Sequence, residues 1–83
     1  MKIGTVVFSK RGRDKGRPFV VVSEESEYIY LVDGDVRPLE KPKKKKVKHV
    51  QPTNTVFDLQ SVGKRGLNDS DFRKWLEPFR RRS

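Results

Sequence analysis

A basic stretch containing two glycines spans residues 10–17, with the sequence Lys-Arg-Gly-Arg-Asp-Lys-Gly-Arg. Guanidinium groups donate paired hydrogen bonds to phosphate oxygens, and ammonium groups act near them as mobile point charges. Gly12 and Gly16 can take positive φ and let the backbone approach a ligand closely. The stretch is therefore suited to binding phosphates, and it predicts a phosphate-rich partner, with RNA as the first hypothesis.

The alternative for residues 10–17 is a solubilising loop whose charges face water. The stretch holds five cations and one acid, Asp14. Cations this close repel one another unless an anion lies nearby, so phosphate binding is the favoured interpretation. Asp14 is expected to be structural, either accepting hydrogen bonds from the turn backbone or orienting an arginine.

A second basic element, the lysine run, covers residues 41–46. Repulsion among its charges predicts an extended and mobile chain in the free protein. In a complex it would lie along an RNA backbone and release counterions without recognising base sequence. A solvated linker and a nuclear-import-like signal are the two alternatives for this run. The basic residues from Arg80 to Arg82 are either a third contact or a frayed terminus.

Composition excludes several functional classes. The chain has 83 residues, enough for one domain, and a net charge of +9, which attracts polyanions and favours a monomer through self-repulsion. It has no cysteine, which excludes disulfides, zinc ribbons, iron–sulfur ligation and thiol catalysis. The single histidine, His49, is expected to be packed or backbone-bonded rather than catalytic. No catalytic constellation is visible, so we expect no enzymatic activity, no metal and no cofactor.

The N-terminal sequence does not resemble a secretory signal. Residues 1–4 lead directly into strand-like sequence, and no window approaches the ~18 apolar residues of a membrane span. We therefore expect a soluble, cytoplasmic protein without a membrane partner. Attachment of the lysines to an anionic membrane is a weaker hypothesis, because no apolar anchor accompanies them.

Short β-branched and aromatic runs, separated by turn signals, place the basic stretch between two strands. The turn signals include an acidic cluster at residues 24–27 and the Asp-Gly-Asp sequence at residues 33–35. Several runs are apolar on both faces, which favours closure of the sheet into a small antiparallel barrel. Five strands are predicted, at residues 3–9, 19–23, 28–32, 36–39 and 47–50, with Pro38 confining the fourth to an edge.

Helical spacing begins after residue 55. Residues 56–62 are predicted to form one or two helical turns that end at Gly63 or Gly66. A stronger helix signal follows at Asn68, which is a favourable N-cap residue. Two acids, Asp69 and Asp71, lie in the first helical turn after it, where the helix dipole favours negative charge.

The aromatic residues of the second helix favour packing on the sheet. Leu67 and Phe72 are placed for a hydrophobic staple, and Trp75 and Phe79 continue the same apolar face. Pro78 is predicted to end or kink the helix near residue 76. A stacking platform made by Tyr28, Tyr30 and Phe8 is an alternative to core packing for the strand aromatics.

Residues 4–22, which include Gly-Arg-Asp-Lys-Gly between two strands, resemble the KOW motif. Residues 46–52, Lys-Val-Lys-His-Val-Gln-Pro, extend the similarity. They resemble the final strand of the archaeal and eukaryotic large-subunit ribosomal proteins of the fourteenth "e" class and of their small bacterial KOW-domain relatives.

The resemblance implies that the mainly β, five-stranded barrel over residues 1–53 is SH3-like. The sequence pattern itself predicts a short helical extension with a basic tail over residues 54–83. It implies a non-catalytic, ribosome-associated module that binds ribosomal or structured RNA and, as further partners, ribosomal proteins. An alternative is a protein-interaction adaptor of the translation or transcription machinery that uses the C-terminal aromatic helix. The candidate RNA-binding residues are Lys10, Arg11, Gly12, Arg13, Lys15, Gly16, Arg17, Lys43, Lys44, Lys45, Lys46, Lys48 and His49.

Overall fold

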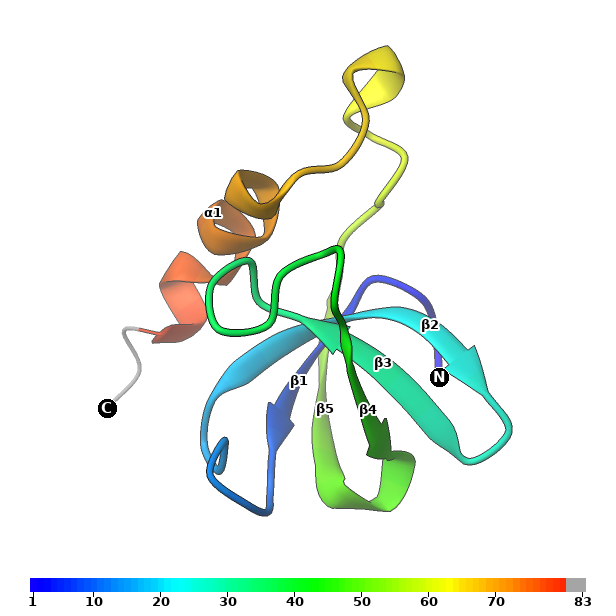
Figure 1. Cartoon of the computed structure of the whole chain (residues 1–83), viewed down its shortest axis with the longest axis vertical. Helices are drawn as coiled ribbons and strands as arrows, with labels where there is room; N and C mark the ends of the chain where they lie inside the picture. The colour runs from blue at the N-terminus through cyan, green and yellow to red at the C-terminus, as the bar shows by residue number, and fades with distance from the viewer. Residues whose placement is uncertain (81–83) are drawn as a thin grey trace.

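Five antiparallel strands form one sheet, and a single α-helix follows them in the chain (Figure 1). The computed structural model describes residues 1–80. The strand order in the sheet is β4-β3-β2-β1-β5. The elements are β1 (Thr5–Ser9), β2 (Pro18–Glu25), β3 (Tyr28–Val32), β4 (Lys43–Lys46), the 3-10 helix η1 (Val47–His49), β5 (Val50–Val56), the 3-10 helix η2 (Gly63–Arg65) and α1 (Asp69–Arg80).

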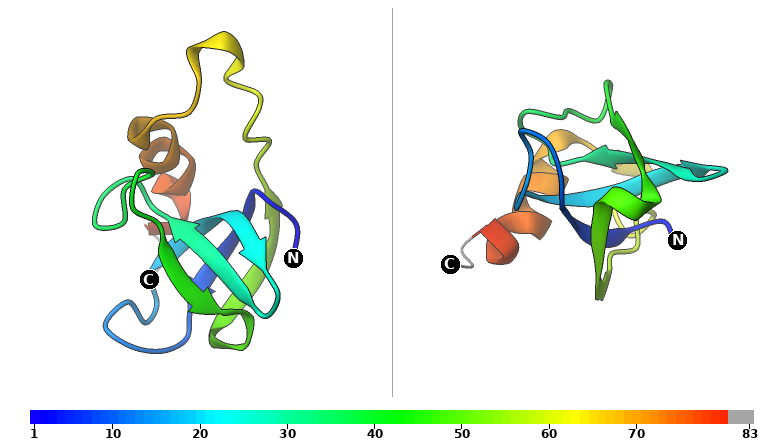
Figure 2. Two further views of the ribbon diagram at one scale, coloured as in Figure 1. Left: turned by 45° about the vertical axis from the view of Figure 1, so that its right-hand side comes forward. Right: turned by 90° about the horizontal axis from the view of Figure 1, so that it is seen from below.

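The mainly β class and the first three predicted strands are confirmed, because β1, β2 and β3 fall within or around the expected ranges. The predicted closure into a barrel is not shown. Strands β4 and β5 lie at opposite ends of the strand order, and no hydrogen-bonded pairing joins them. The result is an open five-stranded sheet whose two ends are connected through η1 (Figure 2).

Apolar side chains alternate between the two faces of this sheet, as the period of a strand requires. Val6, Val20 and Val32 pair across β1, β2 and β3 and pack on one face against Phe72 and Leu76 of α1. The opposite face carries a second cluster, formed by Val7, Phe19, Val21, Ile29, Leu31 and Val50. Helix α1 therefore covers one face of the sheet, and the second apolar cluster occupies the other.

The N-terminus of α1 agrees with its sequence signals. The side-chain oxygen of Asn68 accepts a hydrogen bond from the backbone N–H of Asp71 (3.3 Å), and the Asp71 carboxylate accepts one from the Asn68 N–H (3.0 Å). This reciprocal arrangement is a capping box. Leu67 and Phe72 join the same apolar cluster, as the predicted staple requires.

Pro78 is predicted to end or kink the helix near residue 76. An end there is wrong, because α1 continues through Pro78 to Arg80, whereas a kink stays a prediction. Proline removes one backbone donor and usually bends a helix. Here two tertiary contacts hold the last turn: the Phe79 ring lies 6.1 Å from the Phe8 ring, and the Arg80 guanidinium donates to the carbonyl of Asp33 (3.0 Å).

The predicted strand at residues 36–39 is also wrong, because residues 33–42 form a loop between β3 and β4. The Asp33 carboxylate accepts the backbone N–H groups of Asp35 (2.8 Å) and Arg37 (2.9 Å). The Leu39 N–H donates to the Asp69 carboxylate at the start of α1 (2.6 Å). Side chains therefore take the donors that a strand would offer to a neighbouring strand.

The fourth strand comes from the lysine run instead. Repulsion predicts a mobile run, but Lys43–Lys46 is β4 and pairs with β3 from Leu31↔Lys43 to Tyr28↔Lys46. The predicted strand at residues 47–50 is wrong over most of its length, because Val47–His49 forms η1 and β5 begins at Val50. The sharp η1 turn allows β5 to cross to the far end of the sheet and pair with β1.

The predicted helical turns at residues 56–62 are wrong. Val56 still belongs to β5, and the Phe57 N–H donates to the Gly4 carbonyl (2.9 Å). The Asp58 side chain then accepts the Gln60 N–H (2.9 Å), which forms a local turn that competes with a helix. Between β5 and α1 the connecting segment, which includes η2, extends away from the sheet before the chain returns as α1 (Figure 1).

Candidate nucleic-acid interface

The basic loop, residues 10–17 between β1 and β2, is built from two successive tight turns. The Lys15 N–H donates to the Gly12 carbonyl (3.1 Å), and the Arg17 N–H donates to the Asp14 carbonyl (2.8 Å). Gly12 and Gly16 have φ values of 81° and 86°, a region that side chains disfavour. The two glycines therefore allow the backbone of the loop to form two hydrogen-bonded turns in a compact conformation.

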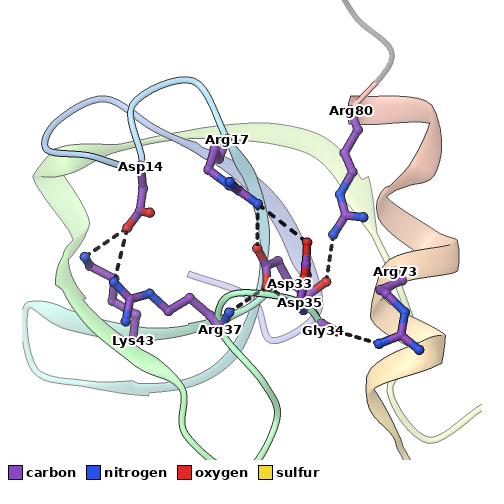
Figure 3. A network of polar contacts seen from close by, with 9 residues as sticks. All are labelled: Asp14, Arg17, Asp33, Gly34, Asp35, Arg37, Lys43, Arg73 and Arg80. Atoms are coloured by element: carbon purple, nitrogen blue, oxygen red, sulfur yellow. Dashed lines mark hydrogen bonds and ion pairs between the residues drawn. The ribbon is translucent and has the colours of Figure 1, made fainter.

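The loop separates its charges. Asp14 is buried, and its Oδ2 atom lies 2.9 Å from Lys43 Nζ and 3.8 Å from the Arg37 guanidinium (Figure 3). Four other cations of the loop are exposed, and none of the four forms an ion pair with another of the residues 1–80. These exposed cations are Lys10, Arg11, Arg13 and Lys15.

The electrostatic environment of Asp14 keeps its carboxylate ionised. Burial alone raises the pKa of Asp14, but the hydrogen bond and charge of Lys43 and the charges of Arg37 and Lys45 lower it more. The pKa of Asp14 therefore lies below its ordinary value. The predicted structural role of Asp14 is confirmed in a broader form, since its partners are cations from outside the loop.

Arg17 differs from the other loop cations. Its guanidinium is half-buried and lies 3.4 Å from the Asp33 carboxylate and 4.0 Å from the Asp35 carboxylate (Figure 3). Asp33 is almost fully buried and also accepts an N–H from Arg37. The sequence places Arg17 among the phosphate ligands, but the structure uses part of its donor capacity to fasten the basic loop to the β3–β4 loop.

Helix α1 is fastened to the same β3–β4 loop by two arginines. Arg73 donates to the Gly34 carbonyl (2.7 Å), and Arg80 donates to the Asp33 carbonyl (3.0 Å). Figure 3 shows Arg17 and Arg80 approaching the Asp33 region from the two sides. The sequence offers Arg80 to Arg82 as a third RNA contact or a frayed terminus. Of these residues only Arg80 is described by the structure; Arg81 and Arg82 lie outside the described residues.

Strand alternation divides the four lysines of β4 into two pairs. Lys43 pairs with Asp14, and the Lys45 ammonium donates to the Ser9 hydroxyl (2.6 Å) and to the Arg11 carbonyl (2.7 Å). Burial lowers the pKa of Lys45, and the charge of Lys43 adds to this effect. The side chains of Lys43 and Lys45 therefore fasten the basic loop to β4.

The other two lysines of β4 lie opposite tyrosines. In the sheet register Lys44 faces Tyr30 and Lys46 faces Tyr28. The Lys44 ammonium lies 4.5 Å from the centre of the Tyr28 ring. Lys44 is exposed and Lys46 is half-exposed, so their charges remain open to solvent.

Lys48 and His49 lie in η1, next to the basic loop, because the Lys10 N–H donates to the His49 carbonyl (2.8 Å). Lys48 is exposed and His49 is partly exposed. Desolvation and the positive charges of Arg11 and Lys48 lower the pKa of His49, which makes its imidazole neutral at pH 7. A neutral imidazole can still stack on a base or donate one hydrogen bond.

The aromatic side chains of α1 pack inside the domain. Trp75 stacks on Phe57 (5.1 Å between ring centroids, 10° between planes) and meets Phe72 edge-on (5.4 Å). Phe57, Phe72 and Trp75 all pack in the apolar cluster that Val6, Val20 and Val32 form on this face of the sheet. Docking of the helix, rather than a ligand-binding aromatic face, is therefore confirmed for these side chains.

No protein-family model matches the sequence, and no curated protein matches it either. Within residues 1–80, no helix has the length and apolar character needed to cross a bilayer. Within the same residues, no three potential metal-binding side chains of histidine, aspartate or glutamate lie together.

Two residues that hold the basic loop and the β3–β4 loop together, Asp33 and Arg37, are not among the predicted site residues. The Asp-Gly-Asp sequence at residues 33–35 gave a turn signal, and Gly34 does have a positive φ of 77°. Nothing in the local sequence indicates that Asp33 is buried against Arg17. An aspartate next to a glycine after an apolar strand, in a chain with excess arginine, is the signal that could have suggested it.

Proposed function

We propose that this protein is a non-catalytic RNA-binding module of the SH3-like KOW type that associates with the ribosome in the cytoplasm. It binds structured RNA, with ribosomal RNA as the preferred partner, mainly through phosphate contacts, and works as a monomer. The observation that carries the proposal is the separation of charge in the basic loop. Asp14 is turned inward against Lys43, whereas Arg13 and Lys15 are exposed beside it.

The surroundings of the loop support phosphate binding. Lys48 and His49 adjoin Lys10 through η1, and Lys46 precedes them in the chain. Lys46, Lys48 and His49 therefore adjoin a loop whose backbone is held in place, so little backbone ordering is needed when the loop binds. Contacts of this kind position a protein on nucleic acid without recognising base sequence.

The SH3-like assignment rests on the strand order and on the resemblance of residues 4–22 and 46–52 to the KOW motif. The five-stranded antiparallel arrangement, with β1 between β2 and β5, is compatible with such a fold. The adaptor alternative loses its main support because Trp75 stacks on Phe57 and the helix uses its aromatic face for packing.

The experiment is filter binding of a labelled structured RNA over a salt series. If ~6–10 phosphates are contacted, affinity should fall by roughly three to five decades between about 50 and 200 mM salt. Replacing Arg13 and Lys15 by alanine should weaken binding and reduce the slope of log affinity against log salt by about one per residue. The melting temperature should stay close to that of the wild type, because neither side chain has an ion-pair partner within residues 1–80.

The matched control is the double variant Lys64→Ala/Lys74→Ala, which removes the same charge from exposed positions on η2 and α1, outside the basic loop. It should lose much less affinity than the loop variant. Equal losses of RNA affinity in both variants would mean that binding depends only on the net charge of the protein. Salt-insensitive binding, or no binding at low salt, would overturn the proposed function.

A further inference from the structure

An open groove of about 750 Å³ lies beside the basic loop. Its walls come from the end of the basic loop, from the first half of β5 and from the last turn of α1. Clefts of roughly 300–1,000 Å³ are large enough to hold most of a small organic ligand. Gly16 and Arg17 belong both to the basic loop and to the groove, so the two surfaces are continuous.

Part of the groove lining is apolar and aromatic. Phe8 of β1 and Phe79 of α1 pack with their ring centroids 6.1 Å apart and their planes inclined by 57°. Pro52 lines the β5 side and is exposed. Flat apolar surfaces of this kind suit the faces of nucleobases, which stack on aromatic side chains independently of base identity.

The lining also includes two arginines that are already oriented. Arg17 contacts the Asp33 carboxylate (3.4 Å), and Arg80 donates to the Asp33 carbonyl (3.0 Å). A guanidinium has five N–H donors, so each arginine keeps donors beyond its contact with Asp33. Two positive charges in the lining make the groove complementary to an anionic ligand with a flat apolar part.

Two side-chain amides complete the lining. Gln51 and Asn54 of β5 are exposed, and neither side chain forms a hydrogen bond within residues 1–80. An amide group offers both donors and an acceptor, which is the combination that the hydrogen-bonding edge of an unpaired base requires. The groove therefore combines a stacking surface, amides for a base edge and guanidinium groups for phosphates.

We propose that this groove binds one unpaired base of an RNA segment whose neighbouring phosphates are held by the basic loop. The inference rests on the proposed RNA-binding function and adds a site for a single-stranded nucleotide. Charge complementarity and continuity with the basic loop favour RNA over a protein segment as the occupant. A duplex, whose bases are stacked and paired, does not fill the groove.

The test compares two short single-stranded RNAs of equal length and charge. One carries 2-aminopurine at its centre, and the other carries an abasic site at the same position. Stacking and base-edge contacts predict that the full-length protein binds the 2-aminopurine strand roughly tenfold more tightly than the abasic strand. The side-chain amide NMR signals of Gln51 and Asn54 should shift with the 2-aminopurine strand and stay in place with the abasic strand.

The control variant is Gln51→Ala/Asn54→Ala, which keeps the net charge and changes two exposed side chains. It should reduce the difference in affinity between the two strands without abolishing it, because the Phe8–Phe79 surface remains, and it should retain the salt dependence of the wild type. If the wild type binds both strands equally, with unshifted amides but normal salt dependence, the groove proposal is overturned and the phosphate-binding function stands. That outcome would leave the groove to a protein segment. Absence of binding to either strand and to structured RNA at low salt overturns both proposals.

Discussion

The Oδ2 atom of Asp14, in the basic loop, lies 2.9 Å from the Nζ atom of Lys43, in β4. This contact joins two segments that are both strongly basic and that repel each other at long range. The acid of the loop neutralises one lysine of the strand, and Lys45 adds hydrogen bonds to Ser9 and to the Arg11 carbonyl. The loop and β4 consequently form one braced unit whose remaining charges face solvent.

Removing the charge of Asp14 should destabilise the protein and change its response to acid. Because the folded-state pKa of Asp14 is below its unfolded value, its carboxylate stabilises the fold at neutral pH, and this stabilisation is lost as pH falls below about 4 towards the folded pKa. We expect Asp14→Asn to lower the free energy of unfolding by about 1–2 kcal/mol at pH 7, and to give a shallower decline in acid. Urea denaturation at a series of pH values measures both effects.

The control for this prediction is Asp35→Asn. The Asp35 carboxylate is largely exposed and lies 4.0 Å from Arg17, so its contribution is screened by water. The free energy of unfolding of Asp35→Asn should stay close to that of the wild type at every pH of the series. If the free energy of unfolding of Asp14→Asn equals that of the wild type at pH 7 and declines equally in acid, the role assigned to Asp14 is contradicted.

The lysines of β4 should divide into two functional pairs. Lys43→Ala/Lys45→Ala removes the contacts that brace the basic loop, and its melting temperature should fall by about 4–8 °C for each kcal/mol lost. Lys44→Ala/Lys46→Ala removes the same charge from the tyrosine side of the strand. It should leave the melting temperature within a few degrees of the wild type, because exposed cation–π contacts contribute only about 0.5–1 kcal/mol.

The same two variants should differ in RNA binding if the proposed function holds. Lys44→Ala/Lys46→Ala should reduce the salt slope of RNA affinity by about one for each lysine that contacts a phosphate. Thermal melting by circular dichroism and filter binding on the same samples separate the two effects. Equal melting temperatures for both double variants would show that strand alternation does not divide the lysines.

Gly34 should be far less tolerant of substitution than Gly12, although both have positive φ, 77° and 81° respectively. A Cβ atom at Gly34 would lie 2.2 Å from the Asp69 carbonyl oxygen, at the start of α1, whereas a Cβ at Gly12 meets nothing within 4 Å. Gly12→Ala should cost about 1 kcal/mol for the backbone conformation alone. Gly34→Ala should cost about 1–3 kcal/mol more because the helix must shift.

Equilibrium urea unfolding of the two alanine variants measures this difference directly. Since the strain of positive φ is common to both, the difference isolates the close approach of α1 to the β3–β4 loop. Similar losses in the two variants would mean that α1 is not seated against Gly34.

The fluorescence of Trp75, the only tryptophan in the chain, should report the docking of α1. Its indole stacks on Phe57 and contacts Phe72, so acrylamide should quench it much less in the native protein than in urea. Phe57→Leu should increase quenching by removing the stacked ring. Native quenching as strong as that of the unfolded chain would show an exposed helix face and would revive the protein-adaptor hypothesis.

Local sequence signals predicted the elements whose stability comes from near neighbours. The β-branched runs mark β1, β2 and β3, since their side chains suit a pleated and half-buried surface. Asn68 marks the start of α1 because its partner, Asp71, lies within the same turn. The basic loop was likewise predictable, because its glycines and charges act through local backbone geometry and through a long-range field.

The elements that were predicted wrongly depend on distant partners. Pro78 stays helical because Phe79 packs on Phe8 and because Arg80 reaches Asp33. Residues 36–39 form no strand because the carboxylates of Asp33 and Asp69 take their neighbours' N–H groups. The Phe8–Phe79, Asp33–Arg80 and Leu39–Asp69 contacts each join residues far apart in the chain, so no local pattern contains them. The Asp33–Arg37 contact spans only four residues.

The sequence by itself determined that this protein is a basic, mainly β domain with a glycine-shaped cationic loop and a capped C-terminal helix. Only the tertiary structure decided which cations remain available. Asp14 and Asp33 commit Lys43 and Arg17 to ion pairs, whereas Arg13 and Lys15 stay exposed. The physical reason is that charge type is a property of each residue, but pairing depends on which side chains the folded sheet brings within a few ångströms of one another.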